Sequence, residues 1–558
     1  MRQDWKITAF SHFRSGSNST GNHHTSGKGH VCDPFFFPGI VGIHLSLQAK
    51  FRLIFHMTNT ESFTKSPSGR ALLRRIKTDF LGYSTRYKLA TGETTRRRYM
   101  DSTASTLMMG IAFRTAWKFL EHYSNTHSQL HFSAKIASDT YAWAHRRILK
   151  FVQADPDEYT CFFAGNGVTA GMNRIARSLK HFRPDRDLVL VSIMEHHSND
   201  LPHRKHGGNV IHIPVDTHES KMGCIDLKLL EKYLKKYQGR VNYVSVTGIS
   251  NVTGIINPIN RVAKLAHRYD AKVVVDAAQL AAHVPIRMSG HDDPEMDVDA
   301  LVFSGHKTYS PGSPGVIVTR KSILAGIEPE EVGGGMVDRV FPDKYFVTKK
   351  FPDREEAGTP NIVGGILLGT AIEILDRIGM EVVLAEDQKL THTALLEMIK
   401  LDDVVIYGET DTRTCPRAGT ISFNIKNMNH GLVAAILNDY YNIAVRNECF
   451  CAHPYVEKML TLTHADQIKD ARKRNVVDWH AEPWMGMVRV SFGIYNSMDD
   501  VLFFTRSLRE IILKRDEYAL KYAINGKGDY EHRTFKFTTD EYFCIPSTLA
   551  QELSIESN

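Results

Sequence analysis

The 558-residue sequence has little cysteine and little excess charge. The first shortage argues against a disulfide-stabilised protein and the second against a nucleic-acid-binding protein. The seven cysteines are an odd number scattered along a long chain, which is not the pattern of a disulfide framework and predicts a reducing compartment. The net charge of +7 is small for this length. A basic run, TTRRRYMD at 94–101, is interpreted as a solvated surface, so we predict no nucleic-acid partner.

Long apolar runs are also missing. The stretch FFFPGIVGIHLSL at 35–47 is shorter than a membrane span and contains Pro38 and His44, so we predict no membrane helix. It lies in an N-terminal extension, residues 1–84, which we predict to be mobile or poorly structured because its segment 11–30 is polar and has no acidic residue. A transit peptide would need an amphipathic arginine-bearing helix, and this extension has no clean one. Met57 is an alternative start of translation. A cytoplasmic location is favoured, and a mitochondrial one stays open.

A regular pattern begins near residue 85. Helical stretches such as 227–237 and 260–269 alternate with short β-branched runs at 188–193, 243–248, 272–277, 300–305 and 315–320. Strands that are apolar on both faces and separated by helices predict an α/β fold, in which a mostly parallel central sheet has helices on both faces. We predict a large domain at 85–370, whose N-terminal segment contributes to a smaller α+β domain at 371–515. The tail, 516–558, receives no function.

Polar side chains follow several of the predicted strands, at the edge where α/β sheets bind ligands. A glycine-bearing turn opens the helix at 164–179 with Thr169 in its first turn; it suits phosphate, although such turns are common. His196 and His197 suit a metal site, a polar loop or stacking on an aromatic ring. The remaining strand ends carry an amide, a carboxylate and a lysine, namely Asn251, Asp276 with Gln279, and Lys307 with Ser304 and His306.

Together these groups match the needs of pyridoxal phosphate. The cofactor has a phosphate arm, an aromatic ring to stack on, a pyridine nitrogen that a carboxylate keeps protonated, and an aldehyde that a lysine can attack. A desolvated lysine suits this task, because burial favours the neutral and nucleophilic amine.

The motifs YMDSTAST, NTH, GNGVTAGMN, MEHHSN, SNVTG, VDAAQ, FSGHK, EVGGGM, EAGTPN and VRVSFGIYN follow one another along residues 95–512. In sequence and in order they resemble the motifs of class V aminotransferases, which are pyridoxal-phosphate enzymes of fold type I. The resemblance is strongest to the cysteine desulfurase and selenocysteine lyase branch. It implies that Lys307 is the Schiff-base lysine, that Asp276 faces the pyridine nitrogen, and that His196 stacks on the ring.

The same resemblance implies the other cofactor contacts. Gln279 and Asn251 would bond the phenolic oxygen, and the phosphate region would be held by Val168, Thr169, Ser304 and His306. Members of the family are homodimers with shared sites, so a homodimer is implied here, with Thr359 reaching across from a second subunit. Arg489 would grip the substrate carboxylate, a bidentate task that suits guanidinium.

The segment AVRNECFCAHPY, 444–455, aligns with the family loop whose cysteine accepts sulfur. This alignment makes Cys451 the candidate nucleophile, with Arg446 five residues before it. In the alternative interpretation Cys449 and Cys451 are small residues of a partly buried loop. A metal-binding C-x-C pair is less favoured because no second pair stands nearby, and we predict no metal. The loop departs from the family at Glu448, where a glycine is usual, and at Cys449 and Phe450, near the positions of family histidines. The stretch from Cys451 to Arg489 also looks longer than in compact desulfurases.

The sequence therefore predicts a pyridoxal-phosphate-dependent cysteine desulfurase. It would convert L-cysteine to L-alanine and leave a persulfide on Cys451, with a sulfur-acceptor protein as a further candidate partner. One alternative is a class V aminotransferase or β-lyase that does not use Cys451. A second is a non-catalytic dimeric binding protein on the same fold, which the presence of Lys307, Asp276 and Arg489 disfavours.

Overall fold

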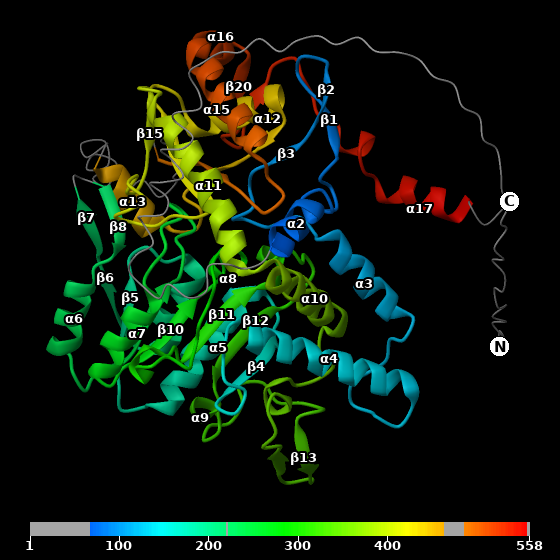
Figure 1. The fold of residues 1–558 in the computed structure, drawn as a ribbon, viewed down its shortest axis with the longest axis vertical. Coiled ribbons are helices and arrows are strands. Elements are labelled where there is room, and N and C mark those ends of the chain that lie inside the picture. Colours follow the sequence, from blue (N-terminus) through cyan, green and yellow to red (C-terminus); the bar gives the residue numbers. More distant parts are fainter. Residues whose placement is uncertain (1–66, 219–220, 463–484, 555–558) are drawn as a thin grey trace. The chain divides into compact units, whose positions relative to one another are not determined.

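The computed structural model describes residues 67–218, 221–462 and 485–554 (Figure 1). Its largest element is a seven-stranded sheet in the order β4-β12-β11-β10-β9-β5-β6. The strands are β4 (Tyr159–Ala164), β12 (Gly315–Arg320), β11 (Ala300–Ser304), β10 (Lys272–Asp276), β9 (Val241–Thr247), β5 (Leu188–Ser192) and β6 (Asn209–Ile213). Pairs from β11 to β6 are parallel, whereas β12 is antiparallel to β11 and to β4. The predicted mostly parallel sheet is confirmed.

Helices cover both faces of this sheet, as predicted. Alternate strand side chains point to opposite faces, so Val274 and Val302 pack with Met172 of α5 (Gly167–Phe182), whereas Val273 and Val275 enter the cluster on the other face. Helix α9 (Lys321–Leu324) lies with α5. The second face is covered by α4 (Phe132–Phe151), α6 (Leu227–Lys236), α7 (Ile259–Arg268), α8 (Leu280–His283) and α10 (Ile362–Ile378).

The second sheet, called here the small sheet, has four antiparallel strands in the order β15-β16-β19-β18. Its strands are β15 (Val404–Ile406), β16 (Thr420–Ile425), β19 (Met487–Ser491) and β18 (Arg446–Glu448). Side chains of α11 (Met380–Ile399), α12 (His430–Tyr441) and α15 (Met498–Leu513) pack on it. An earlier segment joins this region, because β3 (Arg98–Tyr99) pairs in parallel with β17 (Ile443–Ala444).

Two boundaries differ from the sequence prediction. The extension predicted to be mobile includes α2 (Pro67–Ile76), whose Leu73 and Ile76 are buried in the same apolar cluster as α10. The predicted division at 370 falls inside α10, and α11 follows it after Gly379, so no linker separates the two regions there. The rest of the predicted extension, 1–66, lies outside the described residues.

The tail also has structure that its sequence did not reveal. It forms α16 (Arg515–Leu520), the hairpin of β20 (Tyr522–Ile524) with β21 (Tyr530–His532), and α17 (Ile545–Ser554). Tyr518 and Tyr522 are buried in the core of the small sheet. Further hairpins are β1 (Arg86–Lys88) with β2 (Thr94–Arg96), β7 (Val215–His218) with β8 (Lys221–Ile225), and β13 (Val337–Val340) with β14 (Tyr345–Val347).

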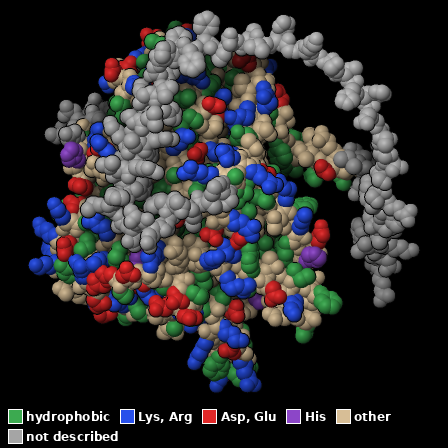
Figure 2. Space-filling view, in the orientation of Figure 1, with side chains coloured by type: hydrophobic (Ala, Val, Ile, Leu, Met, Phe, Trp, Pro, Cys, Tyr) green, Lys and Arg blue, Asp and Glu red, His purple; other side chains and the backbone are tan. Residues whose placement is uncertain are grey.

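Two surface features bear on function. On the face drawn in Figure 2, basic and acidic side chains are interspersed, while hydrophobic and basic side chains gather on the protruding β13–β14 hairpin. The apolar side chains there include Val340, which is 65% exposed, and Phe346, which is 51% exposed. Helix α3 (Gly110–Leu120) exposes Trp117 as well.

Within the described ranges, no helix combines the length and the apolar composition needed to cross a membrane.

Candidate active site

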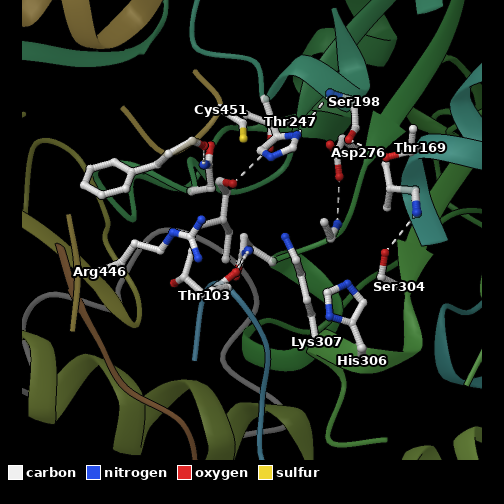
Figure 3. A pocket seen from close by; sticks show the side chains of 18 of the residues that line it. Thr103, Thr169, Ser198, Thr247, Asp276, Ser304, His306, Lys307, Arg446 and Cys451 are labelled. Atoms are coloured by element: carbon white, nitrogen blue, oxygen red, sulfur yellow. Dashed lines mark hydrogen bonds between the residues drawn. The ribbon is translucent and has the colours of Figure 1, made fainter. Parts of the chain in front are cut away.

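A cavity of about 250 Å³ lies at the carboxyl-terminal edge of the large sheet and is lined by residues of both sheets. Twelve of the thirteen residues predicted for the site line it, namely Lys307, Cys451, His196, Asp276, Gln279, Asn251, Val168, Thr169, Ser304, His306, Arg446 and Arg489. Figure 3 shows Lys307 pointing into the cavity from one side and Cys451 entering from the opposite side. Thr359, the remaining residue, is exposed elsewhere, where its hydroxyl accepts a hydrogen bond from Asn125 at 3.0 Å.

Lys307 ends the short 3-10 turn Gly305–Lys307, which directly follows β11. Burial lowers the pKa of Lys307 to about 8, an effect that the nearby Asp276 carboxylate opposes. Burial, with a smaller effect of the Lys307 charge, likewise lowers the pKa of the preceding His306 to about 4. At pH 7 roughly one Lys307 in ten is therefore a neutral amine, far more than for an ordinary lysine.

Two buried carboxyl groups belong to this region: Asp276 lines the cavity, and Glu195 is hydrogen-bonded to Thr247, which also lines it. Asp276 ends β10, accepts a hydrogen bond from Ala278 N–H at 2.8 Å, and has its pKa raised to about 6 by burial. Glu195 accepts hydrogen bonds from Asn199 at 2.6 Å and from Thr247 N–H at 2.8 Å. Burial nevertheless raises the pKa of Glu195 to about 8, so Glu195 is mostly protonated at neutral pH and leaves Asp276 as the carboxylate of this pair.

The first turn of α5 forms a polar cradle at one end of the cavity. Val168 N–H donates to Ser304 Oγ at 2.9 Å, and the hydroxyls of Thr169 and Ser198 are 2.7 Å apart. Gly167 adopts a φ of +62°, and a Cβ there would lie 2.4 Å from Ser304 Oγ, so only glycine fits. Hydroxyls and N–H groups at a helix N-terminus suit a phosphate group.

His196 is held in one orientation beside Lys307. Its Nδ1 accepts a hydrogen bond from Ser198 N–H at 3.0 Å, so the ring proton of the neutral form resides on Nε2. Burial, reinforced by the Lys307 charge, lowers the pKa of His196 to about 3. The imidazole is therefore neutral at neutral pH, and its planar ring suits stacking on an aromatic ring.

Arg489 is the buried cation on the side of the small sheet. It donates to Asn251 O at 3.0 Å and to the Asp101 carboxylate at 3.2 Å, and its guanidinium lies 4.6 Å from the centre of the Phe450 ring. Burial lowers the pKa of Arg489 to about 10, which still leaves it charged at neutral pH. Arg446 is exposed and lies opposite Arg489 in the pairing of β18 with β19.

The loop that carries Cys451 has an unusual backbone. Glu448, Phe450 and Cys451 have φ of 91°, 53° and 55°, in the left-handed region that non-glycine residues rarely adopt. Its carbonyls are held from outside, since His197 N–H donates to Cys451 O at 2.7 Å and Asn251 donates to Phe450 O at 2.8 Å. Such strain persists only where surrounding contacts impose it, so the neighbours fix the direction of the loop.

The two loop cysteines are in different environments. Cys451 is exposed and lines the cavity, whereas Cys449 is buried and lines no part of it. Burial raises the pKa of Cys449 to about 12, which keeps it a thiol. Next to Cys451 the rings of His197 and His453 stack with centres 4.9 Å apart, and His453 Nδ1 lies 3.1 Å from His197 Nε2.

Sequence reasoning missed several residues of the cavity wall and floor. Ser198 follows the predicted strand at 188–193, Thr247 lies near the end of the predicted strand at 243–248, and Phe450 sits between the two loop cysteines. Their positions in the sequence were therefore a usable signal. Thr103 O accepts a hydrogen bond from Gln279 at 2.8 Å, a contact across 176 positions that no local pattern encodes. Glu195 lines no part of the cavity but accepts a hydrogen bond from Thr247 N–H, and in the sequence it is one polar loop residue among several.

The comparisons with known proteins agree with this geometry. Residues 98–504 match the family model described as aminotransferase class-V. A probable cysteine desulfurase of Halalkalibacterium halodurans is 32% identical over 410 residues, which cover 72% of this chain and 90% of that protein. A cysteine desulfurase of Escherichia coli is 32% identical over 362 residues, which cover 64% of this chain and 84% of that protein.

Solved structures give the same result. The apo structure of a cysteine desulfurase from Thermococcus onnurineus is similar with a TM-score of 0.65 and 28% identity, covering 79% of this chain and 98% of that one. The Escherichia coli cysteine desulfurase CsdA is similar with a TM-score of 0.60 and 25% identity, covering 74% and 94% of the two chains. The chain belongs to the class V aminotransferase family.

Proposed function

We propose that this chain is a pyridoxal-phosphate-dependent cysteine desulfurase that converts L-cysteine to L-alanine and leaves the sulfur on Cys451. The observation that carries the proposal is that Lys307, Arg489 and Cys451 line one cavity in a chain whose relatives are named cysteine desulfurases. An aminotransferase needs the first two residues but not an exposed thiol facing them.

The residues present fit the cofactor. The cradle of Val168 N–H, Thr169 and Ser304 suits its phosphate. Gly167 keeps this cradle open, because a Cβ at that position would collide with the Ser304 side chain. The Asp276 carboxylate is buried and accepts one backbone hydrogen bond, from Ala278 N–H. A buried anion favours the protonated form of a neighbouring pyridine nitrogen, so Asp276 suits that position. Lys307 suits the aldehyde and His196 the ring face. When bound, pyridoxal phosphate supplies an electron sink for the bonds around the substrate Cα.

The chain's own residues then have separate tasks. Arg489 binds the substrate carboxylate through its guanidinium, in place of the Asp101 contact. Lys307 Nζ, neutral in part because of its lowered pKa, accepts the Cα proton and later returns a proton to carbon. The Cys451 sulfur bonds to the substrate sulfur while the Cβ–S bond breaks, which gives a persulfide on the chain and alanine as the released amino acid.

The exposed apolar surface supports the further proposal of a homodimer. Val340 and Phe346 on the β13–β14 hairpin are more than half exposed, and Thr359 is exposed outside the cavity of its own chain. Such a patch favours association with another chain, and a two-fold partner would bring Thr359 to the second cavity. Sedimentation should give twice the chain mass, and Phe346→Glu should shift it towards the monomer.

The test of the reaction is a comparison of two loop variants. Purified protein loaded with pyridoxal phosphate should release alanine and sulfide in equal amounts from L-cysteine with a thiol reductant present. Cys451→Ala should abolish this release while the visible spectrum of the cofactor stays unchanged. Cys449→Ala is the matched control, two positions away and buried, and should retain most activity. An active Cys451→Ala enzyme would instead assign the chain to the aminotransferases or β-lyases.

A further inference from the structure

Two cysteines that are far apart in the sequence meet outside the candidate active site. Cys224 lies in β8 and Cys415 lies between β15 and β16, yet their sulfur atoms are 2.9 Å apart across 191 sequence positions. Both are free thiols, and neither lines the cavity that holds Lys307. The proposed reaction gives neither of them a task.

Backbone hydrogen bonds on several sides hold the two cysteines in this position. Glu409 N–H donates to Met222 O at 2.9 Å and Ile256 N–H donates to Pro416 O at 2.9 Å. Arg417 forms an isolated antiparallel bridge with Ile255. Because the segments on both sides of the pair are tied to each other, the closeness of the sulfurs does not depend on flexible side chains alone.

The two thiols differ in a way that suits disulfide exchange. Cys415 is buried and Cys224 is half-buried, and both line a small cavity of about 70 Å³. The hydrogen bond with Cys415 lowers the pKa of Cys224, whereas the same bond and burial raise the pKa of Cys415. Cys224 is the more accessible thiol for a first attack, and Cys415, whose sulfur lies 2.9 Å away, is placed to resolve an adduct formed on it.

The neighbouring residues favour this chemistry over a metal site. Among the described residues no group of three or more His, Cys, Asp or Glu is placed to hold a metal ion, so the pair is not half of such a set. Arg417 is 1% exposed, and its Nε has no hydrogen-bond partner in the described part of the chain. Its charge opposes the rise in the pKa of Cys415, so it assists deprotonation when that thiol reacts.

We infer that Cys224 and Cys415 form a reversible disulfide when the chain meets a low-molecular-weight disulfide such as oxidised glutathione. The Cys224 thiolate attacks one sulfur of the oxidant, forms a mixed disulfide and expels one glutathione thiolate. Cys415 then gives its proton to solvent and attacks the Cys224 sulfur, which expels the second glutathione. Two protein thiols are oxidised to one disulfide, and the oxidant is reduced to two thiols.

The bond would join two parts of the fold that border the active site. It connects the β7–β8 hairpin with the segment 411–418, which is paired with residues 254–256. A few residues earlier in that same strand-end loop, Asn251 holds Phe450 O and accepts the hydrogen bond of Arg489. The oxidised chain therefore has the β7–β8 hairpin tied covalently to the segment 411–418, and backbone hydrogen bonds connect that segment to the loop that supports the Cys451 segment.

The experiment uses the full chain loaded with pyridoxal phosphate, carrying Cys451→Ala so that the exposed loop thiol does not compete. Oxidised glutathione should remove two titratable thiols, lower the intact mass by two hydrogens, and yield a non-reduced peptide that joins Cys224 to Cys415. Dithiothreitol should reverse all three changes. The melting temperature of the oxidised form should rise by roughly a few degrees, because the crosslink restricts the unfolded chain.

Three variants make the result decisive. Cys224→Ser and Cys415→Ser should each abolish the joined peptide, whereas Cys544→Ser, which changes a thiol of the tail, should leave it in place. Unchanged melting curves of the reduced variants would show that each is folded. The inference is overturned if glutathione stays as a stable adduct on Cys224, if both thiols stay free, or if the joined peptide contains another cysteine.

Discussion

Attachment of pyridoxal phosphate to the apo chain should follow the titration of Lys307. Burial holds the pKa of this lysine at about 8, against about 10.4 for an ordinary lysine. At pH 7 roughly one Lys307 in ten is then neutral, compared with roughly one ordinary lysine in 2,500. Only the neutral amine attacks an aldehyde, so the structure predicts an advantage of roughly 250-fold from the lowered pKa alone.

The direction of the pH dependence follows from the same value. Below pH 8 Lys307 is mostly protonated and attachment is slow, so the rate should rise about tenfold between about pH 7 and pH 9 and then level. The rise in visible absorbance after rapid mixing measures this rate, and borohydride reduction with peptide mapping should locate the cofactor on Lys307. Nα-acetyl-lysine, measured in the same buffers, corrects for the titration of the cofactor itself.

Asp276→Asn separates this effect from catalysis. The Asp276 charge raises the pKa of Lys307, so its removal should move the midpoint below 8 and speed attachment at pH 7. Turnover should fall nonetheless, because the pyridine nitrogen loses its anionic partner. A rate that keeps rising through pH 10 in the parent protein, or a midpoint that moves upward in the variant, would refute the reasoning.

The other predictions concern the cradle, the carboxylate site and the loop. Gly167→Ala should cost about 1–3 kcal/mol of unfolding free energy and weaken phosphate binding, because of its positive φ and its contact with Ser304; a chemical melt and a cofactor titration check both, and normal values would contradict the cradle. Arg489→Lys should raise KM for cysteine at least about tenfold with a smaller change in kcat, since one ammonium cannot replace a bidentate guanidinium; equal loss in both would argue against carboxylate binding. His453→Ala removes the stack on His197 and should slow persulfide formation, followed by mass spectrometry, while the cofactor spectrum stays unchanged; an altered spectrum would place His453 nearer the ring.

The strands of the large sheet were predictable because they are apolar on both faces. The run at 315–320 coincides with β12, and the runs at 272–277 and 300–305 each overrun their strand by one residue. Once these strands are predicted, the place of the candidate site can be predicted as well, because the carboxyl ends of parallel strands lie at one edge of a sheet. Asp276 ends β10 and Lys307 follows the neighbouring strand β11, so the two residues had to lie near each other once that pairing was fixed.

Elements that depend on distant partners were not predictable. Helix α2 is short and strongly basic. Its buried side chains, Leu73 and Ile76, stabilise it only through their packing in the same cluster as α10, which no local pattern reveals. The tail looked aperiodic because Tyr518 and Tyr522 reach the small-sheet core from separate short elements. The left-handed backbone of Cys451 is equally invisible in the sequence, since it is imposed by hydrogen bonds from His197 and Asn251.

The contacts of Arg489 connect substrate binding with the sulfur-accepting loop. Before substrate binds, its guanidinium contacts the Asp101 carboxylate and lies against the Phe450 ring, and Phe450 directly precedes Cys451. A substrate carboxylate competes with Asp101 for the same cation, and Asp101 is disposed to yield because burial raises its pKa despite Arg489. Any movement of Arg489 towards a substrate changes its contact with the Phe450 ring, next to Cys451 in the chain. The proposed reaction thus connects the binding of a substrate carboxylate, through one buried cation, to the loop whose Cys451 lines the same cavity.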